Sequence, residues 1–203
     1  MDTAPARNDT LDIYERLAAE YDAARSTALF EAKWLARFTR DLPVDGHVLD
    51  LGCGTGQPIA QWFANEGFRV TGLDFAEAML NIARERQPDG DWRHGDMRHL
   101  DLPEQFDGII AWNSFNHLTQ DEQTACIARI ARHLKLGGSF LTTVGPRAGT
   151  ATGTIAGQKV RHASLSPAGY AACFEDNGMR LTGLLVEDPD TMLHSVLMAR
   201  KDI

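Results

Sequence analysis

The sequence lacks a long apolar run. No stretch of about eighteen apolar residues occurs, so a transmembrane helix and a membrane partner are not expected. Residues 1–9 also lack the apolar core of a signal peptide. Cysteine is scarce: Cys53, Cys126 and Cys173 are widely spaced without a CxxC pair, which argues against a zinc site or a disulfide framework. A reducing, cytoplasmic location follows as the expectation.

Basic charge is also in short supply. The 203 residues include 20 Lys and Arg against 28 Asp and Glu, a formal net charge of −8. Because phosphate binding needs a basic surface, general nucleic-acid binding is not expected. The acidic balance favours a small-molecule or protein substrate, and the length fits one domain with a well-buried core.

Strand-like and helix-like segments alternate through the middle of the chain. Strands are predicted at 47–51, 69–73, 91–94, 106–112 and 139–144, and helices at 58–66, 76–86 and 121–136. Such alternation is typical of an α/β fold, a mostly parallel sheet covered by helices on both faces.

The two ends of the chain depart from this alternation. Before it, a stripe of apolar side chains predicts a helix over 10–24, and a second helix is expected at about 29–40. After it, a polar stretch rich in Gly and Thr (145–157) precedes a helix at 166–177. Segments 179–186 and 193–199 then predict an antiparallel hairpin, since no helix separates them.

A glycine-rich loop, Asp50-Leu-Gly52-Cys-Gly54-Thr-Gly56, directly follows the first predicted strand and precedes a helix. Glycines there let a ligand approach the backbone, and this edge of an open α/β sheet is the usual ligand crevice. The dinucleotide fingerprint requires a third glycine where Gln57 stands. Pro58 also removes an N–H that a pyrophosphate would use, so the loop suits a ligand without a phosphate bridge.

Asp74 ends the second predicted strand, eighteen residues after Gly56. A carboxylate in that place can accept hydrogen bonds from both ribose hydroxyls of an adenosine, and Phe75 can pack on the purine. The alternative is that Asp74 only caps the helix that begins near Ala76. The loop and the acid at this separation favour the ribose role.

In these segments the chain resembles the class I, Rossmann-like S-adenosylmethionine-dependent methyltransferases. Residues 48–58 look like the family's first motif, 70–80 like the second, and Gly95-Asp96-Met97 like the third. Residues 106–118 resemble the fourth motif and 136–140 the late motif. The resemblance implies a three-layer sandwich around a seven-stranded sheet in the order 3-2-1-4-5-7-6, with strand 7 antiparallel and N-terminal lid helices.

The resemblance also implies binding roles for S-adenosylmethionine and its product S-adenosylhomocysteine. Tyr14 and Tyr21 lie in a segment similar to the lid helix of small-molecule members; for Tyr14, core packing is an equal alternative. The implied cofactor-binding residues are Tyr21, Asp50, Gly52, Cys53, Gly54, Gln57, Asp74, Phe75, Met79, Asp96, Met97, Asn113 and His117.

No dedicated general base is evident. His117, just after the fourth strand, and His162, between the fifth strand and the last helix, are the candidates. The alternatives for His117 are a substrate contact or a packed residue near the cofactor, and the alternative for His162 is an exposed loop or edge-strand position. The run Trp112-Asn113-Ser114-Phe115 lacks the Pro-Pro-Tyr of amino-methylating enzymes that act on DNA or protein glutamine. Asparagines replace the carboxylates that a metal would need, so no metal is expected.

The sequence therefore predicts methyl transfer to an oxygen or nitrogen of a small molecule, by direct displacement aided mainly by proximity and orientation. A non-catalytic module that binds the cofactor is the alternative. A nicotinamide-dependent oxidoreductase is disfavoured by Gln57 and the terminal hairpin. We expect a single domain over 1–203, with a helical lid (1–42), a cofactor-binding core (43–145) and a substrate-side segment with the hairpin (146–203).

Overall fold

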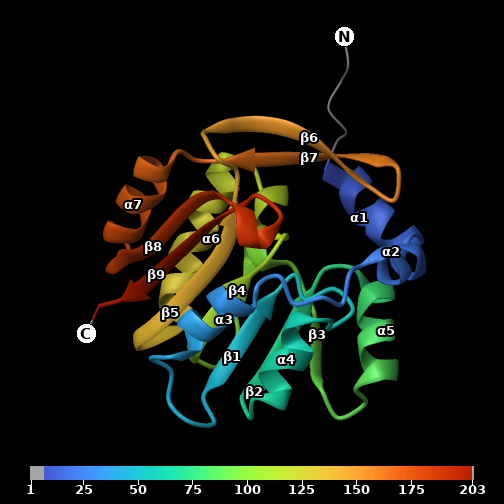
Figure 1. The fold of residues 1–203 in the computed structure, drawn as a ribbon, viewed down its shortest axis with the longest axis horizontal. Helices are drawn as coiled ribbons and strands as arrows, with labels where there is room; N and C mark the ends of the chain where they lie inside the picture. The colour runs from blue at the N-terminus through green and yellow to red at the C-terminus, as the bar shows by residue number, and fades with distance from the viewer. Residues whose placement is uncertain (1–6, 203) are drawn as a thin grey trace.

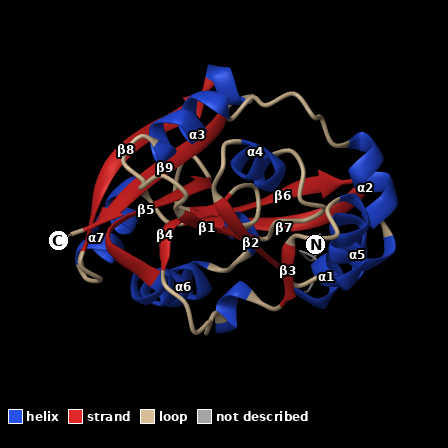
Figure 2. Ribbon diagram, turned by 90° about the horizontal axis from the view of Figure 1, so that it is seen from below, coloured by secondary structure: helices blue, strands red, loops and turns tan. Residues whose placement is uncertain are grey.

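The computed structural model describes residues 7–202. The first six residues, part of the segment for which no signal peptide is expected, lie outside this range. A twisted sheet runs through the middle of the molecule with helices on both faces (Figures 1 and 2). No helix within the described range is both long and apolar enough to cross a membrane.

The main sheet has seven strands in the order β3-β2-β1-β4-β5-β9-β8. β1 to β5 are parallel, and β9 runs antiparallel to both β5 and β8. The predicted order and its antiparallel strand are confirmed. The strands are β1 (His47–Leu51), β2 (Arg69–Asp74), β3 (Asp91–His94), β4 (Phe106–Ala111), β5 (Leu134–Val144), β8 (Met179–Asp188) and β9 (His194–Lys201).

The helices form two layers with a hydrophobic core on each face of the sheet (Figure 2). One core includes Phe38 and Phe63 from α3 and α4; the other includes Ile127 and Phe174 from α6 and α7. Side chains of β1 enter both cores, which is why its sequence is almost continuously apolar. The helices are α1 (Arg7–Arg16), α2 (Ala18–Ala24), α3 (Ala32–Thr39), α4 (Ile59–Asn65), α5 (Glu77–Arg86), α6 (Gln120–His133) and α7 (Pro167–Glu175), with short 3-10 turns η1 (Met97–His99), η2 (Phe115–His117) and η3 (Pro189–Thr191).

Two helix predictions need correction. The helix predicted over 10–24 is divided into α1 and α2 at Leu17, whose backbone leaves helical geometry. The helix predicted to reach residue 136 ends at His133, because Leu134 already pairs with Phe106 of β4 and starts β5. The predicted caps of α7 are correct: Ser166 Oγ accepts the Gly169 N–H, and Pro167 is the first helical residue.

A second, two-stranded sheet was not predicted. β6 (Gly149–Ile155) and β7 (Gln158–Ser164) form an antiparallel hairpin in and after the polar stretch at 145–157, where no strand was predicted. Figure 1 shows this hairpin lying across the end of the main sheet where the parallel strands finish, next to α1. Its place over that edge makes it one wall of the site described below.

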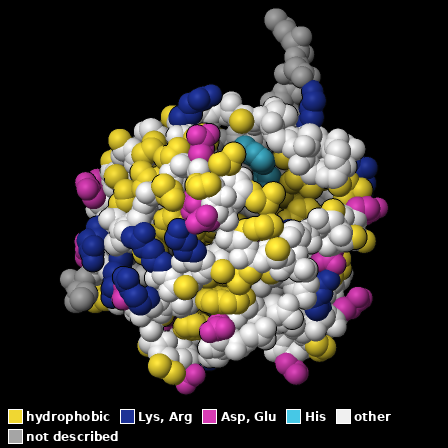
Figure 3. Space-filling model, viewed as in Figure 1, with side chains coloured by type: hydrophobic (Ala, Val, Ile, Leu, Met, Phe, Trp, Pro, Cys, Tyr) yellow, Lys and Arg dark blue, Asp and Glu magenta, His cyan; other side chains and the backbone are white. Residues whose placement is uncertain are grey.

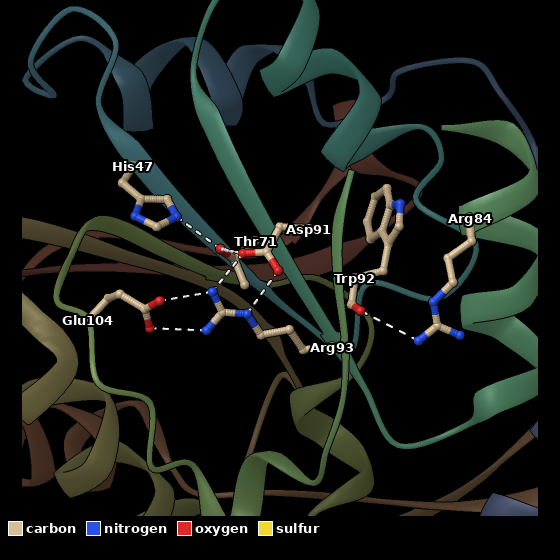
Figure 4. Close-up of polar contacts among 7 residues, drawn as sticks. All are labelled: His47, Thr71, Arg84, Asp91, Trp92, Arg93 and Glu104. Atoms are coloured by element: carbon tan, nitrogen blue, oxygen red, sulfur yellow. Dashed lines mark hydrogen bonds and ion pairs between the residues drawn. The ribbon is translucent and has the colours of Figure 1, made fainter. Parts of the chain in front are cut away.

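A polar network joins the three strands at one side of the sheet (Figure 4). His47 Nε2 lies 2.9 Å from Thr71 Oγ1, and that hydroxyl donates to Asp91 at 2.8 Å. Arg93 then bridges Asp91 and Glu104 with paired hydrogen bonds of 2.7–3.0 Å. Burial lowers the pKa of His47, whereas hydrogen bonds from Arg93 lower the pKa of Asp91. The network fixes the relative positions of the strands that carry the glycine loop and Asp74.

Candidate functional site

The glycine loop after β1 has a backbone conformation that residues with a side chain rarely adopt. Gly52, Gly54 and Gly56 all have positive φ, at +73°, +54° and +77°. A Cβ on Gly52 would lie 2.3 Å from the Cβ of Ser114, whereas nothing lies within 4 Å of the Cβ position of Gly54. The loop therefore packs tightly on the β4 side and leaves its backbone open at Gly54.

The indole of Trp92 supports this loop from behind. Cβ atoms on Gly56 and Gly72 would lie 2.7 and 2.5 Å from its ring atoms. The indole N–H donates to the carbonyl of Gln87 at 3.0 Å, which fixes the ring plane. The missing side chains at these glycines are thus a packing requirement as well as a conformational one.

The loop opens into a cavity of about 400 Å³ at the ends of β1, β2 and β4. Figure 3 shows this face hollowed, with histidine atoms and hydrophobic side chains at the border of the hollow. Most of the residues predicted to bind the cofactor meet here. Those that line the cavity are Tyr21, Gly52, Gly54, Asp74, Phe75, Met79, Asp96, Met97, Asn113 and His117.

The other three predicted residues do not line the cavity. The Cys53 side chain points behind the loop, where a Cβ on Gly72 would lie 2.8 Å from its Sγ. The Gln57 side chain donates to Gln61 Oε1 of the following helix, α4, at 2.8 Å. Asp50 lies buried in β1. Side-chain directions in a loop with three positive-φ glycines do not follow from residue spacing.

Asp74 joins the loop to the start of α5. Its Oδ2 accepts the Gly54 N–H at 2.8 Å, and its Oδ1 accepts the Ala76 N–H at 2.9 Å. It therefore does order the chain before α5, as the capping alternative held, and it also faces the cavity. Burial raises the pKa of Asp74 to about 6, against the lowering effect of these backbone donors. Each carboxylate oxygen still has a lone pair for a ligand hydroxyl.

Asp50 is a buried carboxylate that forms no hydrogen bond or ion pair within the described range. Burial, reinforced by the charge of Asp74, raises its pKa to about 7, and Arg25 opposes the shift. An unpaired buried carboxylate is costly unless a cation approaches it. Together with the open backbone at Gly54, this arrangement fits a ligand with cationic groups, such as the sulfonium and ammonium of S-adenosylmethionine.

The segment after β3 closes another side of the cavity. Asp96 accepts hydrogen bonds from the backbone and guanidinium of Arg98, so its carboxylate is held in place. Arg98 also lies 3.5 Å from Glu122 of α6. Met97, between Asp96 and Arg98 in the sequence, lines the cavity and packs against the core under α6. An oriented acid beside an apolar side chain suits, in composition, the amino group and the ring of an adenine.

The end of β4 carries Asn113, which has a positive φ of 55° without being glycine. Thr143 of β5 stabilises it: the Asn113 N–H donates to Thr143 Oγ1 at 2.8 Å. Next to it, Ser114 Oγ donates to the Leu51 carbonyl at 2.6 Å. Strained backbone of this kind concentrates at functional sites, and here it directs the β4 edge at the cavity.

His117 and His162 come together with Tyr14. The Tyr14 hydroxyl lies 3.0 Å from His117 Nε2, and the two imidazole rings have centroids 5.0 Å apart. Burial, with a contribution from His162, lowers the pKa of His117 to about 4, although the backbone of Arg161 opposes the shift. Burial also lowers the pKa of His162. Both rings are therefore neutral at pH 7, and His162 lies in an edge hairpin beside the cavity.

The helices α1 and α2 cover the cavity on the side opposite β4. Tyr14 and Tyr21 line it, with ring centroids 5.6 Å apart, and Tyr14 also contacts the Phe75 ring at 6.1 Å. Burial raises the pKa of both tyrosines. The core-packing alternative for Tyr14 therefore does not describe it fully, because its hydroxyl reaches the site. Other lining residues that the sequence did not indicate are Thr10, Leu11, Arg98, Thr119, Glu122 and Arg161.

In the comparisons with known proteins, the matches described below are all to methyltransferases. Residues 48–138 match the sequence profile of a family described as a methyltransferase domain. The chain is 36% identical over 111 residues to the dTDP-3-amino-3,4,6-trideoxy-alpha-D-glucopyranose N,N-dimethyltransferase of Streptomyces venezuelae, covering 53% of this chain and 46% of that protein. It is 35% identical over 141 residues to the cypemycin N-terminal methyltransferase of a Streptomyces species, covering 66% and 57%. The chain spans about half the length of the curated relatives it matches.

Solved structures show the same fold. The CcbJ methyltransferase from Streptomyces caelestis superimposes with a TM-score of 0.74 at 22% identity, covering 93% of this chain and 97% of that one. The magnesium protoporphyrin IX methyltransferase of Synechocystis PCC 6803 with bound SAM gives 0.74 at 16% identity, with all of both chains covered. These two structures therefore share the overall fold of this chain.

Proposed function

We propose that the chain is a class I, Rossmann-like S-adenosylmethionine-dependent methyltransferase that transfers a methyl group from S-adenosylmethionine to an oxygen or nitrogen of a small molecule. One observation carries the proposal. Two buried carboxylates, Asp50 and Asp74, lie on adjacent strands beside an open glycine loop, and Asp50 forms no hydrogen bond or ion pair within the described range, although the charge of Arg25 acts on it.

The chain's own groups divide the cofactor between them. Asp74 accepts the ribose hydroxyls with the lone pairs that Gly54 and Ala76 leave free. Asp50 attracts the ammonium group, and Arg25, whose charge acts on Asp50, attracts the carboxylate. Cys53 and Gln57 contribute through their backbone, since their side chains point elsewhere. The remaining predicted residues act as walls: Tyr21, Gly52, Phe75, Met79, Asp96, Met97, Asn113 and His117.

The sulfonium supplies an already activated methyl group, so the protein's main task is alignment and exclusion of water. Tyr14 and Tyr21 exclude water from the side that α1 and α2 cover. His117 is neutral at pH 7 and adds no positive charge beside a sulfonium. If the acceptor must lose a proton, His117 lines the cavity but its Nε2 is engaged by Tyr14, and His162 is the second candidate, with its ring centroid 5.0 Å from that of His117.

The acceptor side of the cavity is formed by segments outside the matched profile. The hairpin β6–β7 and helix α1 approach each other there, and Arg161 of β7 lines the wall. The named relatives act on amino sugars and on a peptide N-terminus. A nitrogen acceptor is accordingly the first class to test. Functionally, we assign the lid to residues 7–42, the cofactor-binding core to 43–145 and the substrate side to 146–202.

Two measurements test the proposal. S-adenosylhomocysteine should raise the melting temperature of the protein, whereas NAD should not; the reverse result would exclude the methyltransferase assignment. A screen of metabolite pools with methyl-labelled cofactor then separates an enzyme from a binding module. Label that appears in no acceptor despite tight cofactor binding would favour the non-catalytic alternative.

A further inference from the structure

The helices that cover the cavity are attached to α5 through two acidic side chains. The first is Glu15 of α1, whose two carboxylate oxygens accept the N–H groups of Glu77 at 2.7 Å and Ala78 at 3.0 Å. These are the first residues of α5, and its N-cap residue, Ala76, provides no side-chain acceptor. Glu15 thus caps α5 from another helix, where the helix dipole favours negative charge.

The second acid is Asp22 of α2. Its Oδ1 accepts the Thr55 hydroxyl at 2.6 Å and Arg86 at 3.0 Å, and its Oδ2 accepts Arg86 at 2.6 Å. Arg86 also donates to the Thr55 carbonyl at 3.1 Å. Thr55 lies in the glycine loop and Arg86 ends α5, so one carboxylate joins α2 to both. Its pKa is lowered, chiefly by the hydrogen bond from Arg86.

Each acid directly follows a tyrosine that lines the cavity: Glu15 follows Tyr14, and Asp22 follows Tyr21. Neighbouring residues on a helix point about 100° apart, so one can face the cavity while the next faces α5. The Glu15 contacts are exposed, whereas the Asp22 contact is partly buried: the side chains of Asp22 and Arg86 are 21% and 27% exposed, against 59% and 71% in the surface pair Asp190–Lys33. Such partly buried, multiple hydrogen bonds to a charge are stronger than surface ion pairs.

We propose that Glu15 and Asp22 are positioning residues of the cofactor site, which hold Tyr14 and Tyr21 over the cavity and thereby set how long the cofactor stays bound. This inference rests on the proposed function, since it presumes that S-adenosylmethionine occupies the cavity. A cofactor in the cavity cannot leave past these tyrosines unless α1 and α2 move away from α5. Glu15 also acts electrostatically on Asp74, so the attachment reaches the proposed ribose subsite.

The test measures binding kinetics of S-adenosylhomocysteine to the full chain. In Glu15→Gln, one carboxylate acceptor is lost; in Asp22→Asn, the ion pair with Arg86 is lost. Hydrogen bonds to charged groups contribute enough that the dissociation rate should rise about 10-fold in each variant, with little change in the association rate. Glu20→Gln is the matched control, because Glu20 is an exposed acid of α2 without a contact in the described range.

A second readout separates positioning from general stability. Hydrogen exchange at the amides of Glu77 and Ala78 should slow when S-adenosylhomocysteine binds to the wild type and should stay fast in Glu15→Gln. The melting temperature without ligand should change far less than the dissociation rate. If Asp22→Asn does not fold, Thr55→Val removes only the hydroxyl contact and tests the same point.

The outcomes distinguish the two proposals. A wild type that does not bind S-adenosylhomocysteine contradicts the proposed function. A wild type that binds it, together with dissociation rates in both variants equal to that of Glu20→Gln, overturns the role of Glu15 and Asp22 and leaves the function intact.

Discussion

At the scale of single residues, the burial of Asp50 and Asp74 has opposite effects on the free energy of unfolding and on affinity for a cationic ligand. In the unfolded chain their pKa values are close to the ordinary aspartate value of 3.8, whereas burial in the folded protein raises the pKa to about 7 for Asp50 and about 6 for Asp74. Between about pH 4 and pH 7 the folded protein thus holds more protons than the unfolded chain. The free energy of unfolding therefore falls as pH rises through this window, whereas affinity for a cationic ligand rises as the carboxylates ionise.

The variant Asp50→Asn tests these opposite effects. It removes the buried charge, so the unliganded protein should become more stable at pH 8, by on the order of 2 kcal/mol, with a much smaller gain at pH 5. Affinity for S-adenosylmethionine should fall at least 10-fold. Urea unfolding at both pH values and calorimetric titration provide the measurements. Stability that drops equally at both pH values would show that Asp50 serves the fold instead.

A glycine substitution tests the packing of the loop. In Gly52→Ala the new Cβ would lie 2.3 Å from Ser114 Cβ at a positive φ, so the loop must shift. We expect binding of S-adenosylhomocysteine to weaken at least 10-fold by equilibrium titration. Gly67→Ala is the control, because Gly67 has a positive φ of +87° with nothing within 4 Å of its Cβ position. Equal loss of binding in both variants would mean that backbone strain, and not the contact with Ser114, is responsible.

Single residues also show how far sequence reasoning reaches. The order of strand, glycine loop, helix and acid brings Gly54 and Asp74 within 2.8 Å of each other, because parallel strands end at one edge. Spacing did not indicate Glu15 and Asp22, since their partners lie 33 to 64 positions away. Contacts of that range depend on how α1 and α2 pack, which the local pattern of these short helices does not specify.

At the scale of secondary structure, the missed hairpin shows a limit of hydrophobic patterning. β6 has the sequence Gly-Thr-Ala-Thr-Gly-Thr-Ile, and most of its residues are exposed, so no apolar alternation is present to reveal a strand. The turn residues Ala156 and Gly157 both have positive φ. Asn-Gly is the dipeptide that usually indicates such a hairpin turn, and Ala-Gly does not. The hairpin is stabilised by pairing with itself and by contacts with η2 and α1.

The network across β1, β2 and β3 permits a test at this scale. Thr71→Val keeps the shape of a fully buried side chain but leaves His47 and Asp91 without their shared hydroxyl. The free energy of unfolding should fall by about 1–2 kcal/mol, because the two hydrogen bonds made by the buried hydroxyl are lost, each with a net contribution of about 0.5–1.5 kcal/mol. Thr124→Val, an exposed position on α6, should cost less than about 0.5 kcal/mol. Urea unfolding compares the two, and equal effects would mean that the network contributes nothing specific.

At the scale of the whole molecule, the site draws on segments from both ends of the chain, so ligand binding should stabilise the fold as a unit. At a free concentration 100 times its Kd, S-adenosylhomocysteine adds about 2.7 kcal/mol. For a domain of this size the melting temperature should then rise by about 5–10 °C in a single transition. Calorimetry with two separate transitions, only one of them shifted by ligand, would contradict this coupling.

The attachment of the β6–β7 hairpin has a consequence for protein engineering. The hairpin segment begins after Gly145, at the end of β5, and ends at Ser164. These two residues are hydrogen-bonded to each other: the Gly145 N–H donates to Ser164 Oγ at 3.1 Å. This hydrogen bond holds the two ends of the hairpin segment together at its base. A hairpin grafted between these residues would replace a wall of the acceptor side while the glycine loop, Asp50 and Asp74 stay untouched. Libraries of hairpins inserted between Gly145 and Ser164 would allow selection for acceptor preference while the cofactor-binding residues stay unchanged.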